Sequence, residues 1–204
     1  MTMPREDMTV LIMAAGTGGH VFPALSIARK LRKHNVRTEW MGTHQGMENQ
    51  LLKGTGIKIH AVSAKGLKGK GVVRLLFAPF MLVQALIQSI RVLSSVNPDC
   101  VLGMGGFVSG PGGLAAKITG RKLVIHEQNA VPGFTNKLLS KIANLVFEAF
   151  PNTFPDSDKV LYTGNPLRSE IAELAEKPRQ YEKSSRSLRI LVLGGSQGAL
   201  AINE

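Results

Sequence analysis

Short apolar segments alternate along the chain with longer segments in which apolar residues recur at helical spacing. The short segments predict buried strands at Val10–Ala14, Thr38–Gly42, Lys58–Val62, Asp99–Gly103, Lys122–His126, Leu145–Ala149 and Lys159–Tyr162. The longer ones predict helices at Val21–Asn35, Met47–Lys53, Val72–Ser95, Leu114–Thr119 and Pro132–Ala143. This alternation is typical of βαβ units, so we predict an α/β fold with a Rossmann-like, doubly wound parallel sheet.

The pattern changes after about residue 170. Residues 171–187 are mostly polar and charged, which predicts a linker that closes an N-terminal domain of residues 1–170. Residues 188–204 then contain one apolar strand, the glycine segment GGSQG and the beginning of a helix. Because one strand and part of a helix cannot bury their own apolar faces, we expect residues 188–204 to be the truncated start of a second domain.

Charge and composition narrow the class of partner. The chain has 204 residues and a net charge of +11, which indicates an anionic partner: a nucleic acid, an anionic membrane or a phosphorylated substrate. Aromatic residues make up only 5% of the chain, and no stacking platform or recognition helix is evident, which argues against nucleic acid. The single cysteine, Cys100, excludes an internal disulfide and favours a reducing compartment. No signal peptide or uninterrupted membrane-spanning run is evident, so we expect a cytosolic protein able to sit on a membrane surface.

Two glycine-rich segments follow predicted strands and are candidates for phosphate binding. They are Gly16–His20 (GTGGH) and Gly103–Gly113 (GMGGFVSGPGG). Glycines let the backbone approach a ligand, and a helix N-terminus directs N–H groups at an anion. The spacing matches neither a dinucleotide fingerprint nor a P-loop, and a plain tight turn remains an alternative for the first segment. If the two segments face each other across a switch point of the sheet, a pyrophosphate would fit between them.

Polar residues at the ends of other strands are further candidates. His20 is either a general base or a helix-capping or core histidine. The segment HEQNAVPG, residues 126–133, suits sugar hydroxyls or proton transfer, with a solvated loop as the alternative. In GNPLR, residues 164–168, Arg168 would meet a phosphate or form a salt bridge at the domain boundary. Ser196 lies in the third glycine segment and is a possible hydrogen-bond donor.

Basic residues precede and enter the long apolar helix predicted after residue 71. The residues that predict an interfacial membrane site are Lys65, Lys68, Lys70, Arg74, Leu75, Leu76 and Phe80. Each cation near an anionic leaflet contributes on the order of 1 kcal/mol. The alternative is an ordinary core helix preceded by a solvated basic loop.

Six motifs together carry a resemblance to one family. GTGGHVFPAL, GLKGKG, VLGMGGFVSGPGGLAA, HEQNAVPGFTNK, GNPLR and GGSQGA occur in this order. From Val10 to its last residue the chain therefore resembles the N-terminal part of the peptidoglycan N-acetylglucosaminyltransferases. The resemblance implies a GT-B fold, in which two Rossmann-like domains flank a cleft. It also implies inverting transfer of N-acetylglucosamine (GlcNAc), without metal or cofactor, from UDP-GlcNAc to the C4 hydroxyl of the muramoyl sugar of lipid I.

The resemblance also assigns roles and partners. It implies donor contacts from Thr17, Gly18, Gly19, Asn129, Arg168 and Ser196. It implies acceptor-pyrophosphate contacts from Gly16, Gly18, Gly105, Gly106, Ser109 and Gly110. The candidates for the base or for acceptor contact are His20, His126 and Glu127. Besides UDP-GlcNAc and lipid I, the implied partners are other cell-wall synthesis proteins and the anionic cytoplasmic face of the bacterial inner membrane, to which the protein would bind peripherally; nucleic acid is not among them.

Two departures and one alternative accompany the resemblance. Ala14 and Ala15 stand where the family usually has glycines, and Phe107 stands where it often has tyrosine, so no hydroxyl is available there. Most donor contacts of the family lie beyond residue 204, so we expect little or no transferase activity from this chain alone. The alternative is a non-catalytic acceptor- and membrane-binding half of a split glycosyltransferase, which works with a separate donor-binding chain.

Overall fold

The computed structural model describes residues 8–64 and 72–176, without the side chains of residues 72–77 and 175–176. Its centre is a seven-stranded sheet in which every neighbouring pair is parallel, in the order β3-β2-β1-β4-β5-β6-β7. The strands are β1 (Thr9–Met13), β2 (Arg37–Thr43), β3 (Ile59–Val62), β4 (Cys100–Gly103), β5 (Lys122–Glu127), β6 (Leu145–Glu148) and β7 (Val160–Tyr162). Each end lies within one residue of its predicted position, and the predicted parallel α/β sheet is confirmed.

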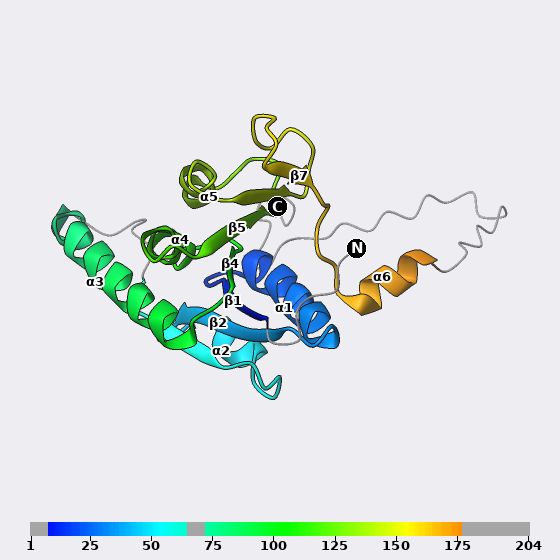
Figure 1. Cartoon of the computed structure of the whole chain (residues 1–204), viewed down its shortest axis with the longest axis horizontal. Helices are drawn as coiled ribbons and strands as arrows, with labels where there is room; N and C mark the ends of the chain where they lie inside the picture. The colour runs from blue at the N-terminus through cyan, green and yellow to red at the C-terminus, as the bar shows by residue number, and fades with distance from the viewer. Residues whose placement is uncertain (1–7, 65–71, 177–204) are drawn as a thin grey trace, which may run out of the picture.

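Helices cover both faces of the sheet, as a doubly wound fold requires (Figure 1). On one face, Val10 and Ile12 of β1 share a buried apolar cluster with Leu25 of α1 (Gly18–Lys33). On the other face, Leu11 and Met13 pack in a second cluster with residues of three helices. These helices are α3 (Val72–Val96), α4 (Ser109–Ile118) and α5 (Phe134–Leu139). The alternation along β1 therefore divides the core into two layers.

Two helices begin earlier than the apolar pattern predicts. Helix α1 begins at Gly18 instead of Val21, and the N–H groups of His20 and Val21 already donate to the Thr17 carbonyl oxygen, at 3.1 and 3.2 Å. Helix α4 begins at Ser109 instead of Leu114. Glycine adds no apolar side chain to the pattern yet adopts helical angles, so periodicity places these starts too late. Much of both glycine segments is therefore helix N-terminus, with unpaired N–H groups close to the sheet edge.

Three shorter helices also depart from the predicted ranges. Helix α2 (Glu48–Leu51) and α5 are shorter than predicted. A short helix was expected before the linker, and helix α6 (Ser169–Glu176) is that helix, although it extends into the range given to the linker, residues 171–187. Residues 177–204, which include the predicted second-domain start, lie outside the described residues. The division into two domains therefore stays a prediction.

Helix α3 contains no uninterrupted apolar run of membrane-spanning length, but its average hydropathy is high enough for one. Its residues Ala78–Val96 are long and apolar enough to cross a membrane, judged by length and composition alone. In the structure, however, Ala85, Ser89 and Leu93 of this helix are buried, and α3 packs against α4 and β3. Only 17% of this segment is buried, so α3 covers the sheet with one face and exposes the rest of its apolar surface.

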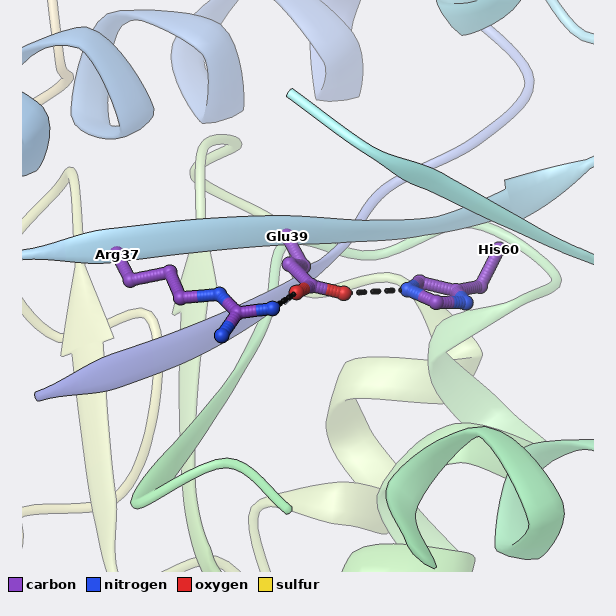
Figure 2. Close-up of polar contacts among 3 residues, drawn as sticks. All are labelled: Arg37, Glu39 and His60. Atoms are coloured by element: carbon purple, nitrogen blue, oxygen red, sulfur yellow. Dashed lines mark hydrogen bonds and ion pairs between the residues drawn. The ribbon is translucent and has the colours of Figure 1, made fainter. Parts of the chain in front are cut away.

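A buried carboxylate ties the edge strand β3 to β2 (Figure 2). Glu39 on β2 pairs with Arg37 of the same strand and, at 2.5 Å, with the Nε2 atom of His60 on β3. Burial by itself raises the pKa of Glu39, but the hydrogen bonds from His60 and Arg37 outweigh it, so the pKa is lowered. The ionised carboxylate thus fixes two strands in register at one side of the sheet.

Candidate functional site

The carboxyl ends of β1, β4 and β5 bring the predicted site segments to one edge of the sheet. Strand β4 lies between β1 and β5, so the loops that follow these three strands are neighbours. The Met104 N–H donates to the Met13 carbonyl oxygen at 2.9 Å, and the Ser109 hydroxyl donates to the same oxygen at 3.1 Å. The two glycine segments therefore adjoin at the edge where open α/β sheets bind ligands.

The two glycine segments interlock at positions that admit no side chain. Gly106 has a φ of +80°, and a Cβ atom there would lie 2.4 Å from the Ala15 carbonyl oxygen. Gly105 has a φ of +94°, and its Cβ would lie 2.4 Å from the Cδ2 atom of His20. Both the left-handed backbone and the lack of space require glycine at these positions. The sequence GMGG thus allows the second segment to contact the first directly.

His20 lies in this junction as a half-buried imidazole. Its Nδ1 atom lies 3.1 Å from the Thr17 hydroxyl, and its Nε2 edge rests against the backbone of Gly105. Burial lowers the pKa of His20, and the charge of Glu127 offsets this only in part. The ring is therefore neutral at pH 7. When Nδ1–H donates to Thr17, Nε2 is the basic nitrogen, as a general base requires.

Glu127, predicted as a candidate for the base or for acceptor contact, is the hub of the loop after β5. One carboxylate oxygen accepts hydrogen bonds from the N–H and the side-chain amide of Asn129, at 3.1 and 2.9 Å. The other accepts from the Gly133 N–H at 3.0 Å and the Asn136 amide at 2.9 Å. With four donors bound and a residue exposure of 2%, the carboxylate shapes the loop and is not placed to take a proton from a substrate.

His126 is likewise part of the framework, although it too was predicted as a candidate base. It is 2% exposed, and its Nε2–H donates to the Gly164 carbonyl oxygen at 3.0 Å. The other nitrogen, Nδ1, is buried with no hydrogen-bond partner among the described residues. Burial lowers the pKa of His126, and the bond to Gly164 and the charge of Glu127 oppose it. The ring is neutral but closed to a ligand, so it joins β5 to the segment after β7.

Asn136 is a site residue that the sequence analysis did not single out. Its amide donates to the His126 carbonyl oxygen at 3.1 Å and to the Glu127 carboxylate at 2.9 Å. It is buried on α5. An asparagine inside the apolar helical stretch FTNKLL is itself a signal, because asparagine is a poor helix former and a buried amide needs partners.

Three other predicted contacts have side chains already engaged. The Ser109 hydroxyl is fully buried and shares its single proton between the carbonyl oxygens of Gly105, at 2.7 Å, and Met13, at 3.1 Å, so it braces the glycine segment and cannot reach a pyrophosphate. The side-chain amide of Asn129 is held by Glu127. The guanidinium of Arg168 lies 5.4 Å from the centre of the Phe22 ring, a cation–π contact at the surface.

Some of the remaining predicted residues lie outside the described part of the chain, and the others are described by their exposure. Ser196, Lys65, Lys68 and Lys70 lie outside the described residues, as do the side chains of Arg74, Leu75 and Leu76. Phe80 is 70% exposed. At the sheet edge, Gly16 and Gly19 are exposed, Gly110 is half-buried and Gly18 is buried. Within residues 8–64 and 72–176, no three His, Cys, Asp or Glu side chains are placed to hold a metal ion.

An apolar groove opens beside the second glycine segment. It lies between α3, α4 and α5 and has a volume of about 760 Å³. Its walls include Met81, Leu86, Phe107, Leu114, Phe134 and Leu138. Phe107, which stands where the family often has tyrosine, lines this groove and is 51% exposed. The groove therefore adjoins the candidate phosphate site without an intervening element.

Comparison with known proteins relates the chain to a family of glycosyltransferases. The family model described as the glycosyltransferase family 28 N-terminal domain matches residues 10–148. The UDP-N-acetylglucosamine–N-acetylmuramyl-(pentapeptide) pyrophosphoryl-undecaprenol N-acetylglucosamine transferase of Acinetobacter baumannii is 50% identical over 96% of this chain and 54% of its own length. The protein of the same name from Pseudomonas syringae pv. syringae is 52% identical over 97% and 55%. The chain thus spans about half the length of the curated relatives it matches.

A solved structure is similar in both sequence and fold. The crystal structure of Acinetobacter baumannii MurG is 51% identical and aligns with a TM-score of 0.68. The alignment covers 76% of this chain and 45% of that chain. The likeness thus extends to most of the present chain.

Proposed function

Because the chain belongs to the glycosyltransferase family 28 N-terminal domain family, we propose that it is the acceptor-binding part of an N-acetylglucosaminyltransferase of peptidoglycan synthesis. The proposed reaction moves GlcNAc from UDP-GlcNAc to the C4 hydroxyl of the N-acetylmuramyl sugar of lipid I, a pyrophosphoryl-undecaprenol. Relatives that carry this reaction in their names are 50% identical to nearly the whole chain. This reaction is assigned to the whole protein, and the present residues supply the acceptor side.

One observation carries the proposal: a neutral imidazole lies against two interlocked glycine segments at the carboxyl edge of the sheet. The N-termini of α1 and α4 direct N–H groups and positive dipole ends to this edge, which favours a pyrophosphate. A pyrophosphate held by Gly105, Gly106 and Gly110 would place the attached sugar near His20. Anion binding and a base are thereby combined in one place.

The chemistry requires a base and a stabilised leaving group. As the acceptor O4 attacks the anomeric carbon of GlcNAc, its proton passes to Nε2 of His20 and the bond from that carbon to the UDP oxygen breaks. Attack from the face opposite to UDP inverts the anomeric configuration. UDP leaves with the electron pair of the broken bond, and helix N-termini stabilise such charge without a metal.

The proposed acceptor is membrane-bound, and the apolar surface of α3 suits a peripheral position on the cytoplasmic face of the inner membrane. Phe80, Leu82, Val83 and Ile87 on this helix are large apolar residues that are exposed. Contiguous exposed apolar surface of this kind marks membrane or protein contacts. Because the chain has a net charge of +11, it should co-sediment strongly with vesicles that contain anionic lipid and weakly with neutral vesicles. Equal binding to both would refute an electrostatic contribution to membrane binding.

The experiment that tests the acceptor role is calorimetric titration of the chain with a short-chain lipid I analogue and, in parallel, with UDP-GlcNAc. The proposal predicts saturable binding of the acceptor analogue and weak or undetectable binding of the donor. An H20Q variant (His20→Gln) should retain acceptor binding within about threefold, because the glycine segments carry the pyrophosphate. No acceptor binding by folded chain would refute the assignment.

A further inference from the structure

We propose that the groove between α3, α4 and α5 binds the first isoprene units of the acceptor's prenyl chain as a protein-bound segment. This inference rests on the proposed function, since the prenyl chain belongs to the proposed acceptor. It adds a lipid subsite to the phosphate and sugar contacts at the sheet edge. The occupant is a single hydrocarbon chain linked to a pyrophosphate.

Continuity with the phosphate site is the first argument. Gly110 and Phe107 belong to the second glycine segment, and both line the groove. Gly110 is also one of the residues expected to contact the pyrophosphate. In a prenyl pyrophosphate, the first isoprene carbon is bonded directly to a phosphate oxygen. A ligand whose phosphates rest on this segment therefore has its hydrocarbon at the mouth of the groove.

The chemistry of the walls is the second argument. Among the described residues that line the groove, none is charged, and the side-chain hydroxyls of Ser63 and Thr135 are its only polar groups. Such a lining disfavours a sugar, a peptide backbone or a phosphate, each of which would lose hydrogen bonds to water. A hydrocarbon loses none, and its burial is favourable. The volume of about 760 Å³ lies in the range of small-molecule sites.

The third argument is the shape of the surface, which favours the prenyl chain over the bilayer as the occupant of the groove. Leu82 and Val83 of α3 and Phe134 of α5 line the groove and are also exposed to solvent, so they form its rim. A rim of this kind can rest on a membrane, whereas the concave space below it has room for a hydrocarbon chain. A chain that emerges from the glycine segment and passes over the rim would connect the site with the membrane.

Soluble diphosphates test the inference without a membrane. The probes are geranyl diphosphate, with ten prenyl carbons, and methyl diphosphate, which has the same charged group without the chain. Burial of each methylene group strengthens binding about fourfold, so geranyl diphosphate should bind at least tenfold more tightly than methyl diphosphate. Both affinities are measured by calorimetry in vesicle-free buffer.

Two exposed residues of α4, one turn apart, provide a matched pair of variants. Leu114 lines the groove and is 44% exposed, whereas Ile118 is 58% exposed and is not among the lining residues. L114S should weaken geranyl diphosphate binding about fivefold or more and leave methyl diphosphate unchanged. I118S should change neither. L138S, on the α5 wall, repeats the test from a second helix, and circular dichroism confirms that each variant is folded.

The outcomes distinguish this inference from the proposed function. Equal affinity of the two diphosphates would overturn the lipid subsite and leave the phosphate site intact. Equal weakening by L114S and I118S would overturn it too, because general surface hydrophobicity would then explain the binding. If neither diphosphate bound the folded chain, both the subsite and the acceptor assignment would be wrong.

Discussion

The loops after β1 and β5 differ in a way that decides which histidine can act. His20 lies in the first turn of α1, after β1, and His126 lies within β5, and both histidines were predicted to take part in chemistry. His20 is half-exposed and lies against Gly105, whereas His126 is buried and bonded to the Gly164 carbonyl oxygen. A position at the carboxyl edge of the sheet is therefore not enough to make a histidine a base. Its accessibility and the hydrogen bonds that it already makes determine its role.

The difference originates in the residues around each histidine. Strand β1 is followed by the buried residues Ala14 and Ala15 and by Gly16, which is exposed and has no atom within 4 Å of an added Cβ. After β5, Glu127 collects four N–H donors and fixes the following turn. The first segment thus keeps exposed positions at Gly16 and Gly19, whereas the second is held by the hydrogen bonds to Glu127.

Removal of the hub should have the largest effect on this comparison. E127A would leave four donors without their acceptor, two from Asn129 and one each from Gly133 and Asn136. The Asn136 donor is buried, whereas Asn129 and Gly133 are exposed and can bond to water instead. Because an unpaired buried donor costs about 1–3 kcal/mol, we expect a loss of roughly 3 kcal/mol in the free energy of unfolding. Urea denaturation measures it.

The control for the hub is E127Q, which keeps the shape but replaces one acceptor oxygen by a donor. It should be destabilised less than E127A. If E127A unfolded within 1 kcal/mol of the wild-type chain, the support role of this loop would be refuted.

The glycine junction should give the next largest effect. G105A forces an alanine into a φ of +94° and places its Cβ against the His20 ring, at a cost of about 1–3 kcal/mol for the backbone alone. In G110A, the added Cβ would meet only the Thr135 methyl at 3.6 Å, an ordinary contact. Thermal unfolding should therefore separate the two variants clearly. Equal stabilities would mean that the segments do not interlock as described.

The pH dependence of stability should show a smaller effect of the two neutral histidines. Burial lowers the pKa of both His20 and His126 below the ordinary value of 6.5. Below pH 6.5 the unfolded chain therefore binds protons that the folded chain refuses, so stability is complete above about pH 6.5 and falls as the pH decreases further.

The variant H126Q isolates one of these contributions, since glutamine can still donate to Gly164. Its urea midpoint should change less between pH 7.0 and pH 5.5 than that of the wild-type chain. An unchanged or steeper dependence would contradict the assignment of a buried, neutral imidazole at this position.

The central strands β1, β2 and β4 were predictable from the sequence because their apolar runs are short and buried on both faces, as parallel strands are. The edge strands β3 and β7 are only partly buried, and short apolar runs alone predicted them. The helix starts at Gly18 and Ser109 were not, because glycine contributes nothing to an apolar period. The placement of the two glycine segments at one edge of the sheet was predictable, because both follow parallel strands and the carboxyl ends of parallel strands share an edge.

Within the site, residue type alone did not predict the role of a side chain, because burial determines whether that side chain can reach a ligand. His126 and Glu127 are residue types used in catalysis, but whether β5 carries them into the interior depends on the segments that pack over them, Gly164 and Asn136 among them. These contacts join residues far apart in the chain. A single sequence shows a polar run at such a place and does not show what covers it.

The most direct test of the central claim is proton NMR of the two imidazole rings during titration with methyl diphosphate, with H20Q and H126Q used to assign the signals. We expect the ligand to raise the pKa of His20, because a nearby anion stabilises the imidazolium, and to leave the His126 signal unchanged. A response of His126 without one of His20, or no response of either ring at saturating ligand, would contradict it.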